Sequence, residues 1–373
     1  MPLRALARVN LAAVERNVAR LMRRLAPGVR LCAVVKADGY GHGAVPVARA
    51  ALAGGASGLA VASAGEAAEL RAGGIDAPIL VMGAISHDEL PLALAADAEL
   101  VAWSEAFVEA VARAAGTRAR MHVKLDTGMG RLGTRRMEEA LAVAERIAGA
   151  GRALRLVGAM THFATADEDP EFLGVQLAAF EPFVARLRGQ DPGILAHAAN
   201  SAALLREPAS HYDMVRPGIA IYGSDPMNRD PADHGLEPAL SLTSYVAAVK
   251  AAQPGDSVGY GRRFVAERET MIATLPIGYA DGIRRCLSNN CEVIVGGRRH
   301  PLVGTVSMDN ITLDLGPATD VRVGDAATII GREGDERQTA EELARRAGTI
   351  SYEILCGITS RVPRSYHRDG APV

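Results

Sequence analysis

Residues 31–43 read LCAVVKADGYGHG. The first five are apolar and of strand length, a lysine follows them, and a glycine-rich stretch comes next. A continuous apolar run without alternation is typical of a strand that is buried on both faces, as in a parallel sheet covered by helices. The stretch therefore predicts a strand over Leu31–Val35 that ends in Lys36.

The same pattern recurs along the following residues, with helical patterns between the apolar runs. Ser63 and Glu66 are spaced as a capping box before a helix that ends at glycines 73–74, and a second helix has an apolar face over residues 137–147. Eight such strand and helix units in a row predict an α/β fold, a closed (β/α)8 TIM-type barrel. The predicted strands are Leu31–Val35, Ser57–Ala62, Pro78–Met82, Glu99–Trp103, Met121–Leu125, Leu156–Met160, Ile194–Ala198 and Met214–Val215.

From about residue 236 the pattern changes to short alternating segments with hairpin signals. Residues 296–297, both glycine, fit a two-residue hairpin turn, and one helix is expected between the capping pair Thr339 and Glu342 and the terminating Gly348. We therefore expect a barrel domain over residues 1–235 and a mostly β C-terminal domain over residues 236–373. The first ten or so residues are expected to pair with the second domain.

Composition excludes several classes of protein. The 373 residues are 49% apolar, and 41 basic residues against 43 acidic ones give a net charge of −2, so no field of one sign favours nucleic acid. Arg4, Arg8 and Glu15 interrupt any N-terminal signal segment, and no apolar run is long enough to span a membrane. We expect a cytoplasmic protein. The four cysteines do not suit a disulfide scaffold, and Cys286 and Cys291 lack partners at zinc spacing, so no metal site is expected.

Unusual residues follow the predicted strands at one end of the barrel, where barrel enzymes carry their reactive groups. A desolvated lysine amine can form a Schiff base with an aldehyde cofactor, although a lone lysine is more often a solvated charge. A serine and glycine amides after the seventh and eighth strands suit a phosphate. The residues in question are Lys36, Lys124, Arg131, His162, Asn200, Ser201, Arg216 and Gly218.

A set of motifs in a fixed order extends from residue 33 to residue 364. In this order, the chain resembles the bacterial alanine racemases, which are fold-type III pyridoxal-phosphate (PLP) enzymes. The motifs are VVKADGYGHG, KLDTGMGRLG, THFATAD, HAANSA, VRPGIAIYG, VGYGRRF, GYADG, VGTVSMD and ISYEILCGI followed by RVPR.

The resemblance implies how the cofactor is held. It makes Lys36 the lysine that binds the cofactor aldehyde, and it makes Arg216 the donor to the pyridine nitrogen, where most PLP enzymes place a carboxylate. An arginine cannot accept that proton, so the ring stays neutral and is a weaker electron sink, which favours reprotonation over transamination. The remaining cofactor-binding residues that it implies are Tyr40, Arg131, His162, Asn200, Ser201, Gly218, Ile219 and Tyr352.

Racemisation needs one base on each face of the substrate Cα, and Lys36 can be only one of them. By resemblance the other is Tyr260, which reaches the cofactor of the partner subunit in a homodimer, and His162 tunes this tyrosine. A lone histidine at a strand end is otherwise more often a core residue.

The resemblance also assigns residues to the substrate. Arg131 contacts the cofactor phenolic oxygen and the substrate carboxylate, and Met308 offers its backbone N–H to the same carboxylate. Lys124 matches a lysine that many members carbamylate to orient Arg131, the alternative being an unmodified barrel lysine. Tyr279 and Asp309 match residues that line the access route from the partner subunit.

Two positions depart from the family pattern. Ser307 stands where members often have cysteine, and Thr305 stands where many have arginine. Ser307 is expected to keep its backbone role. Thr305 removes a charge near the access route and leaves the breadth of substrates open.

These observations predict a PLP-dependent racemase that interconverts L- and D-alanine, either for the peptidoglycan of the cell wall or for alanine catabolism. A serine or broad-specificity racemase is the first alternative. A fold-type III decarboxylase would be expected to place an acidic residue, not Arg216, at the pyridine nitrogen. A non-catalytic PLP carrier would consist of the barrel alone.

Overall fold

The computed structural model describes residues 3–115 and 118–373. It divides into two compact units, which we treat separately. The barrel unit comprises Glu15–Gly39 and Ala44–Ile221, and the β-rich unit comprises Met1–Val14, Tyr40–Gly43 and Tyr222–Val373. A division of the sequence at residue 235 stays a prediction.

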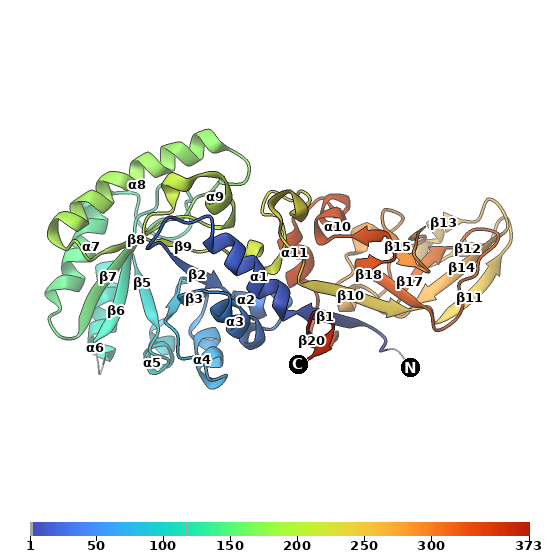
Figure 1. Ribbon diagram of the computed structural model, residues 1–373, viewed down its shortest axis with the longest axis horizontal. Coiled ribbons are helices and arrows are strands. Elements are labelled where there is room, and N and C mark those ends of the chain that lie inside the picture. The colour runs from blue at the N-terminus through green and yellow to red at the C-terminus, as the bar shows by residue number, and fades with distance from the viewer. Residues whose placement is uncertain (1–2, 116–117) are drawn as a thin grey trace. The chain divides into compact units, whose positions relative to one another are not determined.

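The barrel unit confirms the predicted fold. Eight parallel strands close into a barrel in chain order, and the first strand pairs with the last through Arg30 opposite Met214 (Figure 1). Most residues of these strands are buried, as the apolar runs predict, although Arg155 is exposed. The strands are β2 (Arg30–Val34), β3 (Gly58–Val61), β4 (Ile79–Val81), β5 (Glu99–Ala102), β6 (Ala119–Lys124), β7 (Leu154–Met160), β8 (Leu195–His197) and β9 (Met214–Val215).

Most of the helices follow a barrel strand and cover the outside of the barrel (Figure 1). The capping box at the start of α4 is present in both directions, since the Ser63 side chain accepts from the Glu66 N–H and Glu66 reaches back to the Ser63 backbone. The helices are α1 (Leu11–Met22), α2 (Lys36–Gly41), α3 (Ala44–Ala53), α4 (Ala64–Ala72), α5 (Leu90–Ala95), α6 (Glu105–Ala114), α7 (Met137–Gly149), α8 (Pro170–Gln190) and α9 (Ser201–Arg206).

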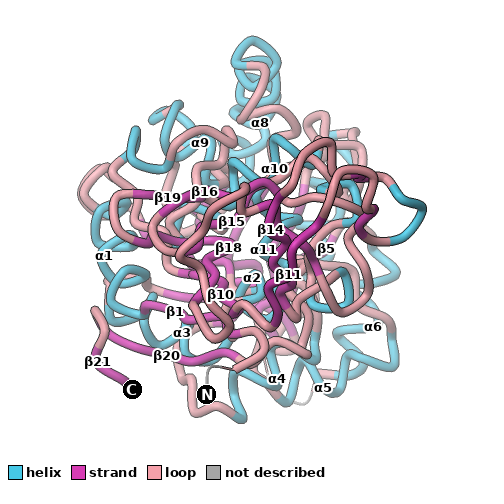
Figure 2. Tube along the Cα trace, turned by 90° about the vertical axis from the view of Figure 1, so that its right-hand side faces the viewer, coloured by secondary structure: helices cyan, strands magenta, loops and turns pink. Residues whose placement is uncertain are grey.

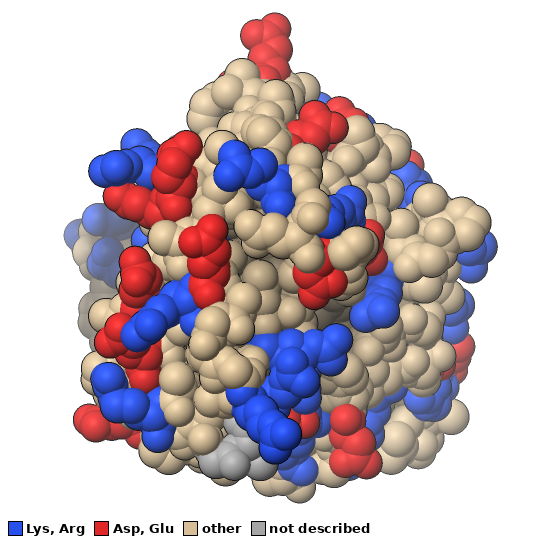
Figure 3. Space-filling view, turned by 90° about the vertical axis from the view of Figure 1, so that its left-hand side faces the viewer, with Lys and Arg blue, Asp and Glu red and all other residues tan. Residues whose placement is uncertain are grey.

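The surface of this unit mixes the two signs of charge. On the face drawn in Figure 3, Lys and Arg side chains are interspersed with Asp and Glu, which agrees with a net charge of −2. Among the described residues no helix combines the length and the apolar character needed to cross a bilayer.

The β-rich unit is built around one large sheet (Figure 2). Its strands run in the order β16-β15-β18-β10-β1-β20-β21, with β19 beside β18, and β1 pairs with β10 and β20. A three-stranded sheet β11-β14-β17 and the pair β12-β13 complete it. The strands are β1 (Leu6–Asn10), β10 (Leu240–Tyr245), β11 (Ala248–Ala252), β12 (Ser257–Val258), β13 (Phe264–Val265), β14 (Thr270–Leu275), β15 (Glu292–Val295), β16 (Arg298–Pro301), β17 (Ile311–Asp314), β18 (Ala326–Glu333), β19 (Glu336–Gln338), β20 (Arg364–Arg368) and β21 (Ala371–Pro372).

The predicted hairpin turn and the predicted helix are both present in this unit. Gly296 and Gly297, with φ of 60° and 71°, connect β15 to β16, as a two-residue turn requires. Helix α10 (Ala340–Ala347) begins after Thr339 and ends at the left-handed Gly348. The expectation of a single helix was wrong, because α11 (Ser351–Cys356) follows it. A six-residue segment is too short to show a helical period in sequence.

Short 3₁₀ turns occur in both units, and two of them carry tyrosines considered below. The turns are η1 (His87–Glu89), η2 (Pro208–Ser210), η3 (Ile219–Tyr222), η4 (Pro231–His234), η5 (Tyr260–Arg262), η6 (Tyr279–Asp281) and η7 (Arg285–Leu287).

Candidate active site

A pocket opens at the C-terminal end of the barrel strands, and we call it the rim pocket. It has a volume of about 150 Å³ and is lined by Lys36, Lys124, Arg131 and His162 together with apolar residues. Lys36 follows β2, Lys124 ends β6 and His162 follows β7, so strand order alone brings these side chains to one rim. The chain has only three lysines, and two of them line this pocket.

The surroundings in the rim pocket disfavour the protonated forms of Lys124 and His162. Burial, and then the nearby cations Arg216 and Arg131, lower the pKa of Lys124 to about 8. Burial also lowers the pKa of His162 well below its ordinary value, and Arg216 and Lys124 act in the same direction. His162 is therefore a neutral imidazole at neutral pH, and a minor fraction of Lys124, about a tenth, is a neutral amine that can react.

Arg216, which follows β9, is almost completely buried. Its Nη1 donates to His197 Nδ1 at 2.6 Å, and its Nη2 donates to the carbonyl oxygens of Thr161 and Ala198 and lies 3.5 Å from His162 Nδ1. Burial lowers the pKa of Arg216 to about 10, which still leaves it a cation at neutral pH. Its Nε is buried and has no hydrogen-bond partner among the described residues.

A second polar group of the barrel unit lies after β8 and β9. The Ser201 hydroxyl oxygen accepts from the backbone N–H groups of Gly218 and Ala220 at 2.9 and 3.3 Å. Asn200, and not Ser201, caps helix α9, because its side chain accepts from the Ala203 N–H. Hydroxyl and amide groups therefore converge beside Ile219, as a phosphate site requires.

The backbone directly after Lys36 is unusual. Ala37, Asp38, Gly39, Tyr40 and Gly41 have φ between 51° and 79°, so five consecutive residues turn in the left-handed sense. Only glycine adopts this conformation without steric cost. Nothing in the sequence apart from the glycines indicates this turn.

Two of the predicted phosphate-site tyrosines belong to the β-rich unit. Tyr40 is buried and stacks on Tyr222 with ring centroids 5.0 Å apart, and the Tyr352 ring lies 5.9 Å from Tyr40. Gly41 lies beside α11, since a Cβ on it would be 2.5 Å from the Leu355 carbonyl oxygen.

Three large side chains of the β-rich unit lie on exposed loops, which we call the tyrosine loops. Tyr260, Met308 and Tyr279 are 74%, 51% and 42% exposed. Thr305 is buried and donates from its hydroxyl to the Tyr260 carbonyl oxygen at 2.8 Å, so it supports the loop that carries this tyrosine. The Ser307 carbonyl oxygen accepts from the Tyr279 N–H at 2.9 Å.

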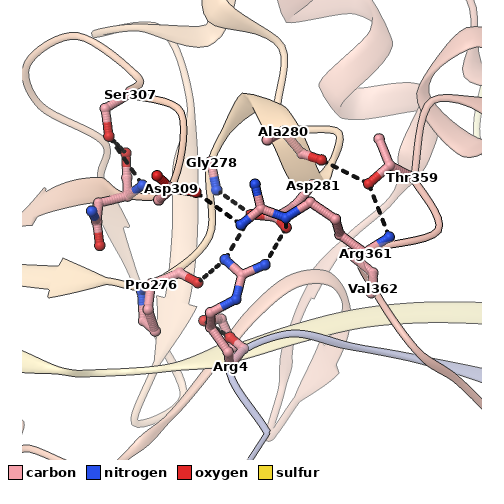
Figure 4. Close-up of polar contacts among 12 residues, drawn as sticks. Arg4, Pro276, Gly278, Ala280, Asp281, Ser307, Asp309, Thr359, Arg361 and Val362 are labelled. Carbon is pink, nitrogen blue, oxygen red and sulfur yellow. Dashed lines mark hydrogen bonds and ion pairs between the residues drawn. The ribbon is translucent and has the colours of Figure 1, made fainter.

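Ion pairs and hydrogen bonds hold the tyrosine loops in place (Figure 4). The Asp281 side chain is fully buried and accepts from Arg4 and from the Gly278 N–H. Arg361 lies 3.5 Å from Asp281 and donates to Asp309 at 2.8 Å, so it bridges the two loops. Gly278 lets them pack closely, because a Cβ there would lie 2.4 Å from the Met308 carbonyl oxygen.

The sequence prediction missed polar side chains inside the barrel. His197 contacts Arg216 directly, and His122 and Glu99 extend the contact across the barrel interior. The available signal was a charged or imidazole side chain within an otherwise apolar strand, as in MHVK at residues 121–124.

A closed barrel with reactive amines, a guanidinium and an imidazole at its C-terminal rim is the arrangement of a barrel enzyme. Family models specify which kind. The model for the alanine racemase N-terminal domain matches residues 9–226, and the model for the alanine racemase C-terminal domain matches residues 239–366.

Known alanine racemases are similar to this chain in sequence and in structure. The chain is 44% identical to the alanine racemase of Symbiobacterium thermophilum over 96% of both chains. It is similar to the crystal structure of alanine racemase from E. faecalis, with a TM-score of 0.92 and 37% identity over 97% of this chain and 98% of that one. It is also similar to the crystal structure of the Bacillus anthracis alanine racemase with bound L-Ala-P. The TM-score is 0.91, and the identity is 38% over 100% of this chain and 97% of that one.

The chain therefore belongs to the alanine racemase family, and the resemblance found in the sequence is confirmed. It is an enzyme of the isomerase class.

Proposed function

We propose that the enzyme interconverts L- and D-alanine with bound pyridoxal 5′-phosphate and two bases, Lys36 and Tyr260 of the partner subunit. The observation that carries the proposal is the rim pocket, in which Lys36 faces a guanidinium and a neutral imidazole in a chain of this family. Alanine is proposed as the substrate because the relatives are named for it.

The residues present fit the cofactor. The buried Nε of Arg216 has no acceptor among the described residues, and the lone pair of a pyridine nitrogen would supply one. Ser201 and the amides near Gly218 and Ile219 would hold the phosphate, with Asn200, Tyr40 and Tyr352 as the remaining predicted contacts. When bound, the cofactor supplies a sink for the negative charge that develops at the substrate Cα.

The residues of the chain then move protons at Cα. The Lys36 amine removes or returns a proton on one face, and the phenolic oxygen of Tyr260 of the partner subunit does so on the other. Because His162 Nδ1 faces the Arg216 guanidinium, its single proton belongs on Nε2, where it can donate to a phenolate. The 74% exposure of Tyr260 suits a side chain that acts outside its own subunit.

Arg131 and the Met308 N–H are proposed to bind the substrate carboxylate, and Tyr279 and Asp309 to line the access route. Lys124 is proposed to carry a carbamate that pairs with Arg131. Its pKa of about 8 supports this, because the neutral amine adds to carbon dioxide and releases one proton. Protein equilibrated with ¹³C-bicarbonate should show a carbamate carbon resonance that Lys124→Gln removes, and identical spectra would contradict the modification.

A cytoplasmic homodimer completes the proposal, and the product D-alanine serves either peptidoglycan synthesis or, in the reverse direction, alanine breakdown. A requirement for D-alanine in the growth medium after deletion of the gene would identify the first role. Thr305, which stands where many family members have arginine, is the observation behind a second candidate function. This function is a racemase that also accepts serine.

The deciding experiment measures D-alanine formed from L-alanine by purified protein, with and without added PLP. We expect racemisation that depends on PLP. Faster turnover of serine would favour the second candidate, and release of carbon dioxide without racemisation would overturn the proposal.

A further inference from the structure

A row of polar side chains crosses the inside of the barrel. Arg216 Nη1 lies 2.6 Å from His197 Nδ1, and His197 Nε2 lies 2.8 Å from His122 Nδ1. The row ends at Glu99, whose Oε2 is 2.9 Å from His122 Nε2. Glu99 lies in β5, His122 in β6 and His197 in β8, and Arg216 directly follows β9; these strands are part of the barrel in Figure 1.

The intervening strand β7 leaves room for this row at one residue. Gly158 pairs with His122 on one side and with Leu195 on the other. A Cβ at Gly158 would lie 2.2 Å from His122 Nδ1, so any side chain there would displace the imidazole. The two histidine rings meet edge to face, with centroids 4.9 Å apart, over this glycine.

The contacts allow only one arrangement of protons. A guanidinium can only donate, so His197 Nδ1 must accept and His197 carries its proton on Nε2. That N–H points at His122 Nδ1, which must accept in turn, and His122 carries its proton on Nε2 and donates it to Glu99. A doubly protonated His122 paired with Glu99 is excluded, because two N–H groups would then face each other.

The row also connects a buried cation to a carboxylate. Among the described residues, Arg216 has no carboxylate within ion-pair distance, although it is only 2% exposed. Burial tends to raise the pKa of Glu99, but its interactions with His122 and with the Arg120 guanidinium, 3.0 Å away, outweigh burial and lower it, so Glu99 is an anion at neutral pH. A buried cation without a counterion is unfavourable, and Glu99 supplies one through two neutral rings.

We propose that Glu99 and His122 are positioning residues that act through His197 to hold the Arg216 guanidinium in one orientation, with Nε directed away from the row. Where this orientation serves the cofactor ring nitrogen, the inference rests on the proposed function. The direction of the hydrogen bonds does not depend on it, because it follows from the donors and acceptors of the chain itself.

Nitrogen NMR of the full-length protein, labelled at histidine and purified with its cofactor, tests the proton arrangement. His197 and His122, identified with the variants His197→Asn and His122→Asn, should both give the signals of neutral rings protonated at Nε2. The His197 signals should persist from mildly acidic to mildly alkaline pH, because burial and then Arg216 lower the pKa of His197 well below its ordinary value. Protonation of both nitrogens of His122, or a proton on Nδ1 of either ring, would overturn the relay.

Kinetics of Glu99→Gln test the positioning role, since glutamine keeps an acceptor for His122 and removes the charge. We expect kcat to fall on the order of tenfold, the scale seen when a residue that orients a functional group is lost, with KM nearly unchanged. The matched control is Asp97→Asn, which removes an exposed carboxylate that also contacts Arg120, at 3.2 Å, but touches neither histidine.

Equal kcat values for Glu99→Gln and the wild type, or an equal loss in Asp97→Asn, would overturn the positioning role. If Glu99→Gln does not fold, the NMR spectrum of the wild type still decides whether the relay exists. If the wild-type protein does not racemise alanine, the proposed function fails, and the same spectrum decides the relay independently.

Discussion

The rim pocket and the tyrosine loops differ in the surroundings that they give to their functional side chains. In the rim pocket, Lys36, Lys124 and Arg131 lie close together beside buried Arg216, and the resulting repulsion and desolvation lower the pKa values of Lys124 and His162. In the tyrosine loops, the backbone carbonyl oxygens of Tyr260 and Met308 accept hydrogen bonds, whereas the side chains of both residues are exposed. In the rim pocket the surroundings shift the pKa values of the functional groups, whereas in the tyrosine loops the side chains are exposed, as we propose for groups that act in a partner subunit.

The largest expected effect comes from replacing Lys36 in the rim pocket. Lys36→Ala should lower racemisation by at least about 10⁴-fold, because it removes the proposed proton-transfer group, which is also the amine proposed to hold the cofactor. The visible absorbance of the bound cofactor should disappear. Lys250→Ala, at an exposed lysine on β11, is the control and should behave as the wild type. Retention of the absorbance in Lys36→Ala would rule out the assignment.

For the exposed region we expect a loss that depends on the isomer. Tyr260→Phe should lower exchange of the α-proton of L-alanine by about 10²-fold or more, and that of D-alanine far less, because Tyr260 is the proposed base for the L isomer. Exchange into deuterium oxide, followed by NMR for each isomer separately, measures both. Equal losses would break the two-base scheme.

Hybrid dimers test whether the tyrosine loops complete the site of another subunit. Mixing Lys36→Ala and Tyr260→Phe subunits gives hybrids in which one site of two is intact. Random exchange makes about half of the dimers hybrids, so about a quarter of wild-type activity should return. Subunit exchange verified by mass spectrometry without any recovery of activity would place each site within one chain.

The smallest expected effect concerns the contacts that anchor the tyrosine loops. Burial tends to raise the pKa of Asp281, but hydrogen bonds from Arg4 and Gly278 lower it. The stability that Asp281 contributes is therefore present above its unfolded pKa of about 3.9 and is lost as pH falls through its lower folded pKa.

Arg4→Met should thus cost about 1–2 kcal/mol at neutral pH, and this difference from the wild type should shrink as the pH falls below about 3.9 and Asp281 becomes protonated. Thermal unfolding as a function of pH measures both effects. Arg8→Met, at an exposed position of β1, is the matched control. If the two variants unfold alike at every pH, Arg4 does not hold Asp281.

Much of the barrel could be predicted from the sequence because most strands are local, largely apolar runs and strand order fixes the rim. The order of the strands also places Lys36, Lys124 and His162 at the rim pocket. The predicted capping box at Thr339 was only half present, since Thr339 accepts from the Glu342 N–H but Glu342 pairs with Arg299 instead of the Thr339 backbone. Here a long-range ion pair competes with a local contact.

The polar row inside the barrel could not be predicted in the same way. The partners Glu99, His122 and His197 are far apart in sequence, and their contact depends on strand register and on a glycine, Gly158, in the strand between them. The exposure of Tyr260 likewise follows from how its loop is held by Thr305, which no local pattern encodes.

The left-handed turn after Lys36 has a consequence for how this segment is stabilised. Ala37, Asp38 and Tyr40 each adopt a conformation that costs about 1 kcal/mol or more in an isolated chain, so the turn has no local tendency to form. It depends on tertiary contacts such as that between the Arg364 side chain and the Gly41 carbonyl oxygen. The segment that follows Lys36 therefore owes its conformation to contacts with the surrounding structure rather than to the preferences of its own residues.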